Sequence, residues 1–211
     1  MKSLNKYLNE GFFSNTGSGL NAAIDQWMKE NTNCDNYTIN NDGTIDVKDR
    51  IEITNKNITE FPDYIRFRRV GGYFDCSGCD FLKSLEGAPK EVGSDFICFN
   101  CGSLKSLEGA PKEVRGSFDC SCCKTLKSLE WTPEKVGRDF DCSFCISLTS
   151  LEVCPKKIGK NFYCSFCDSL TSLEGAPKEV GGHFNCSNCK KQFTEEDIKK
   201  VSNVKKRIMI H

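Results

Sequence analysis

The chain has 211 residues, and its 29 lysine and arginine residues balance 29 aspartate and glutamate residues. This neutral balance gives no overall attraction to nucleic acid or to anionic membranes, and the lack of a run of about 18 apolar residues predicts no transmembrane helix. The opening segment, MKSLNKYLNEGFF, does not resemble a secretion signal. We therefore expect a cytoplasmic location, which would be the host cytoplasm if the protein is viral.

Two short segments precede the main body of the chain. Residues 1–19 contain the sequence SNTGSG and predict a flexible N-terminal arm. Residues 20–42 are expected to form a helical N-terminal cap. Its apolar side chains share one stripe of a helix, at Leu20, Ile24, Trp27 and Met28. The simpler interpretation is that this helix covers the first repeat; the alternative is a docking helix for a partner.

Residues 43–193 carry a repeat with a fixed period of 22 residues. The fullest unit, Val70–Glu91, follows the pattern VGxxFxCxxCxxLxSLEGAPxx. Six Cys-x-x-Cys motifs keep this period without slippage, and they begin at Cys76, Cys98, Cys120, Cys142, Cys164 and Cys186. A fixed period of this length is typical of a solenoid, in which parallel strands stack about 4.8 Å apart.

Within one unit, the alternation Phe-x-Cys predicts a short strand with both side chains on its buried face. The leucine pair that follows, such as Leu82 and Leu85, is expected to turn inward after the strand. Glycine and proline interrupt every unit, so no unit can hold a long helix. Each phenylalanine, cysteine and leucine should therefore stack on its own equivalent in the neighbouring units.

The sequences at both ends of the repeat predict segments that cover its first and last units. Gly43–Pro62 is a degenerate first unit, in which Ile51 and Ile53 take the place of the strand residues. Residues 194–211 are expected to form a C-terminal cap: Thr194 and Asp197 have the spacing of a helix N-terminus, and 204–210 could pair as a last strand. Terminal repeats need such covers because an open final strand invites aggregation.

The unit resembles the leucine-rich repeat, with Val70, Phe74, Cys76, Cys79, Leu82 and Leu85 close to the pattern LxxLxLxxN/CxL. Two of its spacings are one residue longer. The closest form is the short bacterial repeat, and the segments GTIDV, NKNITEFPDYI and SLEGAPKEVGG are similar to leucine-rich-repeat proteins of large bacteriophages. The resemblance implies a mostly β, α/β solenoid: a leucine-rich repeat superhelix with a parallel β-sheet on its concave face and little helix outside the caps.

The 15 cysteines permit several interpretations. The spacing from Cys79 to Cys98 gives CxxC-x18-CxxC, which is typical of zinc, but any CxxC unit of this period generates it automatically. Reduced cysteine is also among the most frequently buried residues, and a thiol at the second position could donate to the carbonyl of a neighbouring unit. We favour packing, with no metal and no cofactor. A zinc-binding structural repeat remains the alternative, followed by disulfides or an iron–sulfur site.

If phenylalanine and cysteine point inward, their neighbours point outward onto the sheet face. These candidate partner-binding residues are Tyr73, Asp75, Asp95, Ile97, Phe99, Asp119, Asp139, Asp141, Tyr163 and His183, with Phe144 and Phe166 at the edge. Aromatic side chains among polar ones are favoured at protein interfaces. The surface is acidic, which favours a partner with a basic patch and disfavours nucleic acid. A solvated face with scattered apolar residues is the alternative.

The preferred function is a non-enzymatic protein-binding scaffold, and the resemblance to phage proteins implies one that binds and blocks a host or defence protein. A zinc-binding structural protein and a virion or self-assembly component are the alternatives. We expect no enzyme, because His183 near Cys186 is the only nucleophile–base pair suggested, and the two should point to opposite faces. The sequence leaves the partner and the oligomeric state open.

Overall fold

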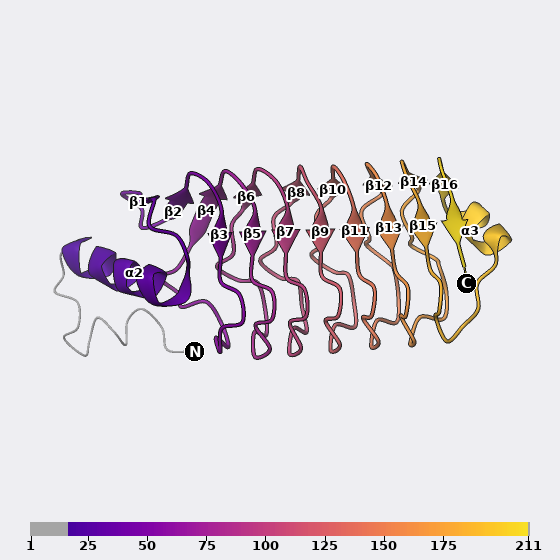
Figure 1. Ribbon diagram of the computed structural model, residues 1–211, viewed down its shortest axis with the longest axis horizontal. Helices are drawn as coiled ribbons and strands as arrows, with labels where there is room; N and C mark the ends of the chain where they lie inside the picture. The colour runs from indigo at the N-terminus through magenta and orange to yellow at the C-terminus, as the bar shows by residue number, and fades with distance from the viewer. Residues whose placement is uncertain (1–16, 211) are drawn as a thin grey trace.

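The computed structural model describes residues 17–210 and is a parallel β-solenoid, a row of similar turns placed between two helices (Figure 1). Its period is that of the sequence repeat, because Phe74, Phe96 and Phe118 are direct partners on adjacent strands. The predicted solenoid and its predominantly β character are therefore confirmed.

Each turn contributes one strand to each of two sheets. The valine sheet has nine strands, β1 (Tyr37–Ile39), β2 (Ile45–Val47), β4 (Phe67–Val70), β6 (Glu91–Val92), β8 (Glu113–Val114), β10 (Lys135–Val136), β12 (Lys157–Ile158), β14 (Glu179–Val180) and β16 (Asn203–Val204). The phenylalanine sheet has eight, β3 (Ile51–Glu52), β5 (Phe74–Asp75), β7 (Phe96–Ile97), β9 (Phe118–Asp119), β11 (Phe140–Asp141), β13 (Phe162–Tyr163), β15 (Phe184–Asn185) and β17 (Ile208–Met209). All pairings are parallel except that of β1 with β2.

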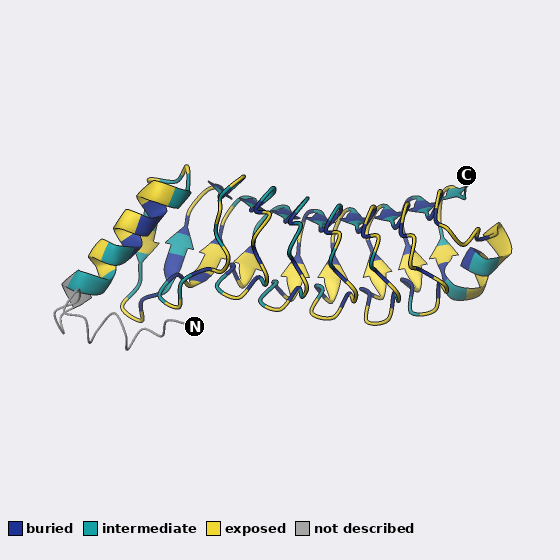
Figure 2. Ribbon diagram, turned by 90° about the horizontal axis from the view of Figure 1, so that it is seen from below, coloured by how far each residue is buried: buried dark blue, intermediate teal, exposed yellow. Residues whose placement is uncertain are grey.

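The interior consists of columns of like residues. Phenylalanine rings stack from turn to turn, with centroids 5.0 Å apart between Phe74 and Phe96 and 5.4 Å apart between Phe96 and Phe118. The repeated valines, cysteines and leucines are also buried, and Figure 2 shows the buried segments recurring in every turn while exposed segments line the outer bends. Each such side chain contributes roughly 1.5–3 kcal/mol through burial, so many equivalent turns stabilise one another.

In five turns a glycine follows the buried valine or isoleucine and lets the turns approach closely, at Gly71, Gly93, Gly137, Gly159 and Gly181, whereas Arg115 stands at this position in one turn. A Cβ added to Gly93 would lie 1.9 Å from the carbonyl oxygen of Gly71, and one added to Gly159 would lie 2.0 Å from that of Gly137. Real atoms do not approach so closely, so these positions need a hydrogen in place of a side chain. In the turns that have this glycine, the bend between the two sheets therefore depends on the absence of a side chain.

Helix α2 (Gly17–Asn31) covers the first turn. Its buried Trp27 packs with ring centroids 6.1 Å from Phe61 and 6.4 Å from Phe67, and Ile24 and Met28 are buried beside it. The cap interpretation of this helix matches these contacts. The helix begins at Gly17, so it includes residues 17–19 of the segment predicted as an arm; the rest of that segment, residues 1–16, lies outside the described residues.

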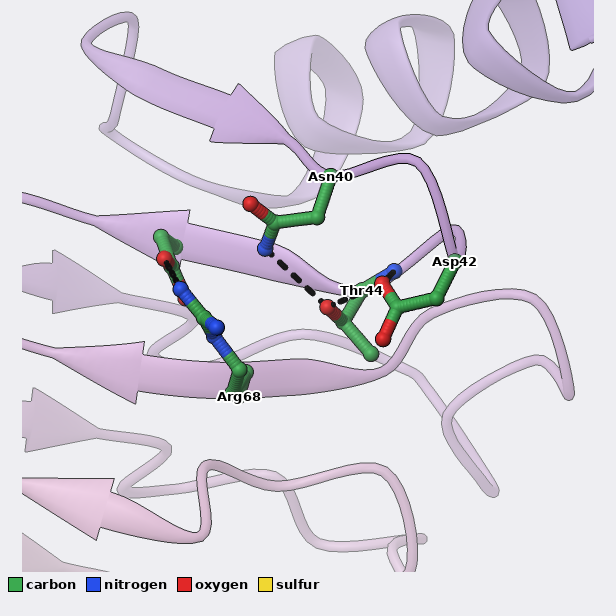
Figure 3. Close-up of polar contacts among 5 residues, drawn as sticks. Asn40, Asp42, Thr44 and Arg68 are labelled. Atoms are coloured by element: carbon green, nitrogen blue, oxygen red, sulfur yellow. Dashed lines mark hydrogen bonds and ion pairs between the residues drawn. The ribbon is translucent and has the colours of Figure 1, made fainter.

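Polar contacts close the hairpin that joins β1 to β2 (Figure 3). The Thr44 hydroxyl donates to Asp42 Oδ1 at 2.6 Å and accepts from Asn40 Nδ2 at 3.0 Å. Beside this turn, Arg68 of β4 pairs with Asp46 of β2. Hydrogen bonding to Arg68 lowers the pKa of the Asp46 carboxyl. The ion pair links the degenerate first unit to the first full turn.

Helix α3 (Glu195–Val201) and the two last strands cover the other end. Thr194 is the N-cap and forms a capping box with Asp197, as the sequence predicts. β16 pairs with β14, and β17 pairs with β15, so the chain end extends both sheets by one strand. Among residues 17–210, no helix is long and apolar enough to cross a membrane.

The close glycine contacts make a direct prediction about stability. We expect Gly93→Ala to lower the free energy of unfolding by about 1–3 kcal/mol, because the new methyl group must push apart two backbones. Gly102→Ala is the matched control, since the nearest atoms to its Cβ would be Asp80 Oδ1 at 3.4 Å and the Asp80 carbonyl oxygen at 3.8 Å. Urea unfolding of both variants would measure the difference, and equal midpoints would contradict this packing.

Candidate functional site

The candidate surface is the outer face of the phenylalanine sheet and the bend that follows it. Strand pairing places Asp75, Ile97, Asp119, Asp141 and Tyr163 in one row, each beside the next in adjacent strands. A second row lies just before the strands and contains Tyr73, Asp95, Asp139 and His183 at equivalent positions. Nine of the ten predicted residues are partly buried, and Phe99 is exposed.

The carboxylates of the first row accept hydrogen bonds from backbone amides of the same turn. Asp75 Oδ1 accepts from the amide of Ser77 at 2.8 Å, and Asp119 and Asp141 accept equivalent bonds from Ser121 and Ser143 at 2.9 and 2.8 Å. These bonds hold the chain as it leaves the strand. Within the described residues, the Oδ2 atoms of these three carboxylates have no hydrogen-bond partner, so one oxygen of each remains for an incoming donor.

The second row is a ladder of side chains that connects the turns. Asp95 Oδ1 accepts from the Ser117 amide of the next turn at 2.6 Å, and Asp139 Oδ1 accepts from the Asn161 amide at 2.9 Å. Asn161 in turn accepts from the amide of His183 at 2.8 Å. The Nδ1 atom of His183 is buried with no partner among the described residues. Sequence reasoning identified these positions but did not identify this structural role.

Burial changes the ionisation of two acids in the first row. Desolvation raises the pKa of Asp119 and of Asp141 above the ordinary carboxyl value, although hydrogen bonds from Ser121 and Ser143 oppose the shift. Asp119 and Asp141 are partners on adjacent strands, so two consecutive turns each add one carboxylate to the row. The face is therefore suited to a partner that supplies positive charge or hydrogen-bond donors.

The bend after each strand uses a left-handed backbone. It lies at the second residue between the cysteines, where φ is +69° at Gly78, +54° at Asn100 and +57° at Asn188. Phe144 and Phe166 occupy the same position with φ of +60° and +56°, a conformation that bulky residues rarely adopt. Their rings stack with centroids 4.4 Å apart and an interplanar angle of 7°.

Four exposed apolar residues at these bends form what we call the corner patch: Phe99, Phe144, Ile146 and Phe166. The three phenylalanines are 42%, 44% and 38% exposed. Phe99 takes the place of a serine that is buried in four other turns, at Ser121, Ser143, Ser165 and Ser187. Sequence reasoning placed Phe144 and Phe166 at the edge of the sheet but did not include Ile146. The break in the serine column was the available signal for Phe99.

The cysteines lie inside and bond to the backbone. In five of the six motifs the second thiol donates to the carbonyl of the first cysteine in the preceding turn, at 3.2 Å for Cys101 to Cys76, Cys123 to Cys98, Cys145 to Cys120 and Cys167 to Cys142, and at 3.3 Å for Cys189 to Cys164. In the first motif, Cys79 donates to the carbonyl of Ile53 at 2.9 Å. Burial raises the pKa of Cys79 and of Cys186 to about 12, so these thiols remain protonated. The predicted packing role and thiol donation are confirmed.

The positions of the thiols also test whether the cysteines form disulfides or bind zinc. All 15 cysteines fall within the described residues, and none forms a disulfide. Across residues 17–210, no group of three or more histidine, cysteine, aspartate or glutamate side chains is placed to hold a metal ion. Zinc binding would need deprotonated thiols, whereas each second thiol uses its proton to bond a carbonyl.

Comparison with protein families, curated proteins and solved structures found nothing that matches this chain.

The raised pKa values of the two acids predict a pH-dependent stability. In Asp119→Asn and Asp141→Asn the amide oxygen can still accept the serine amide, as Asn185 does from Ser187 at 2.9 Å. Because the folded pKa lies above the unfolded value, ionisation of the wild-type acid costs stability as pH rises through the folded pKa. We expect the variants to be more stable than wild type at pH 7, with a difference that disappears below about pH 3.8.

Asp46→Asn is the control of opposite sign. Hydrogen bonding to Arg68 lowers the Asp46 pKa, so this acid contributes stability at neutral pH that is lost on acidification. Thermal unfolding between pH 3 and pH 7 would compare the three variants. A fall in the unfolding temperature of Asp119→Asn at pH 7 would show that desolvation is not the dominant effect there.

Proposed function

We propose that the protein is a non-enzymatic binding scaffold whose partner covers the corner patch and the acidic row beside it. The single observation that carries the proposal is the stacked pair Phe144 and Phe166, because both rings face solvent from a backbone conformation that disfavours them. A left-handed conformation costs a residue other than glycine roughly 1–2 kcal/mol. Asparagine or glycine fills this position in four other turns, at Asn55, Gly78, Asn100 and Asn188, so folding alone does not require phenylalanine.

The chemistry of this surface favours a protein partner with a basic patch. Aromatic anchors in the centre of an interface supply most of its binding energy, and each buried phenylalanine removes about 150–250 Å² from water. The free Oδ2 atoms of Asp119 and Asp141 lie in the adjacent row, where an arginine or lysine could reach them. Nucleic acid would bring phosphate charge toward these carboxylates and is disfavoured.

We propose a leucine-rich-repeat type of solenoid whose phenylalanine sheet is the recognition face, on the resemblance of the repeated VxxxFxCxxCxxLxxL positions. On the similarity to leucine-rich-repeat proteins of large bacteriophages, the partner would be encoded by the host, and binding would block its function. Support for the recognition face comes from the exposed apolar patch, and support for the repeat type comes from the buried columns.

A variant that repairs the bend tests the proposal. Phe144→Asn with Phe166→Asn introduces the residue that Asn100 and Asn188 already provide at this position. We expect loss of partner binding while the unfolding temperature stays unchanged or rises, because relief of the left-handed strain offsets the loss of the ring stack. Cross-linking and affinity capture from host cells, followed by binding measurements with the purified partner, would provide the readout.

Lys127→Ser serves as the control, since it removes an exposed side chain outside the corner patch. Binding should survive in the control and weaken by about a hundredfold or more in the double variant, as expected for loss of two aromatic anchors. A partner that binds the double variant as tightly as wild type would reject this surface.

A further inference from the structure

A second surface lies at the bend before each strand of the valine sheet, where two units differ from the repeated sequence. Most units have the sequence EGAP there, and their glycines adopt left-handed conformations, with φ of +93° at Gly87, +99° at Gly109 and +83° at Gly175. The two units between them replace glycine by Trp131 and Val153, which adopt φ of +70° and +60°. These two residues occupy equivalent positions in consecutive turns.

Neither replacement helps the fold. A left-handed conformation is an outlier for a bulky or β-branched residue and costs roughly 1–2 kcal/mol. Trp131 is 55% exposed and Val153 is 65% exposed, so burial within this chain does not compensate the cost. A strained, exposed apolar pair is the kind of feature that is found at binding sites.

Trp131 stands between two hollows. One hollow, of about 520 Å³, extends from Trp131 to Val153, Cys154 and Pro155. The other, of about 870 Å³, extends to Gly109, Ala110 and Pro111. The indole is therefore a ridge with an apolar recess on each side, which could receive the side chains of an extended segment.

The charges around the ridge are mainly negative. Every unit has a glutamate just before this bend, giving a column of Glu86, Glu108, Glu130, Glu152 and Glu174 at the stacking distance of about 4.8 Å. The walls of the two hollows contain five carboxylates with no ion pair among residues 17–210: Glu86, Glu91, Glu108, Glu130 and Glu134. Of the four wall lysines, Lys90, Lys112, Lys135 and Lys156, Lys135 is already paired with Glu113, so five carboxylates face three ammonium groups.

We propose that this ridge binds an extended protein segment in which basic and apolar residues alternate. An arginine stacks on the Trp131 ring, where its cation meets the π-face, and its charge lies next to the glutamate column. The adjacent apolar residue fills the recess beside Val153. This surface is separate from the corner patch, since the bend before the valine sheet and the bend after the phenylalanine sheet are different parts of each turn.

The test uses a defined probe. An acetylated, fluorescein-labelled peptide of sequence Arg-Leu-Arg-Leu-Arg-Leu is titrated with the full chain and followed by fluorescence anisotropy, with a Glu-Leu peptide of the same length as the negative probe. We expect saturable binding of the Arg-Leu peptide below about 1 mM, weaker binding at high salt, and none of the Glu-Leu peptide.

The matched variant restores the repeat. The double variant Trp131→Gly with Val153→Gly should weaken binding of the Arg-Leu peptide about tenfold or more. It should also raise the unfolding temperature, because glycine fits the left-handed bend. Glu130→Gln with Glu152→Gln should weaken binding and reduce its salt dependence. Phe144→Asn with Phe166→Asn should leave peptide binding unchanged, because the corner patch is a different surface.

Several results would overturn the proposal. No saturable binding up to about 1 mM, equal binding of the Glu-Leu peptide, or full binding by the double glycine variant would each do so. Sedimentation of the wild-type chain as a dimer and of the glycine variant as a monomer would assign the ridge to a second copy of the chain instead.

Discussion

The structure depends on one constraint, the stacking of each turn on the next with every residue beside its own equivalent. Parallel pairing in both sheets supplies backbone hydrogen bonds, and the same register brings phenylalanine onto phenylalanine and valine onto valine. A slip of one residue in any turn would place a polar side chain in each apolar column. The fixed period of 22 residues, the close glycine contacts and the two caps all follow from this requirement.

Cysteine suits the interior columns for a reason that its motif conceals. A CxxC pair suggests a metal or a redox site, but here the second thiol is a small buried donor that satisfies a carbonyl of the preceding turn, as Cys123 does for Cys98 at 3.2 Å. Burial keeps these thiols protonated, with the pKa of Cys189 raised to about 11. Neutral thiols can stack without repelling one another, whereas a column of thiolates could not.

The sequence predicted the solenoid and the burial of the repeated Phe, Cys and Leu positions, because periodicity reports directly on packing. It did not predict the second strand of each turn, such as β6, because glycines separate the valine from the phenylalanine and leave no alternating pattern to read.

The candidate site was predicted only in outline. The roles of Asp95 and Asp119 as hydrogen-bond acceptors depend on which backbone amide lies beside them, and the left-handed strain at Trp131 depends on dihedral angles, neither of which a residue pattern contains.

The central claim is that any unit of this repeat stacks on any other, and insertion of extra units tests it most directly. Three additional copies of Val92–Glu113 placed after Glu113 should lengthen the particle by about 14 Å, since each turn adds about 4.8 Å along the axis. Small-angle X-ray scattering would measure both the longest dimension and the radius of the cross-section. The account predicts the added length with an unchanged cross-section, and a wider particle of unchanged length would contradict it.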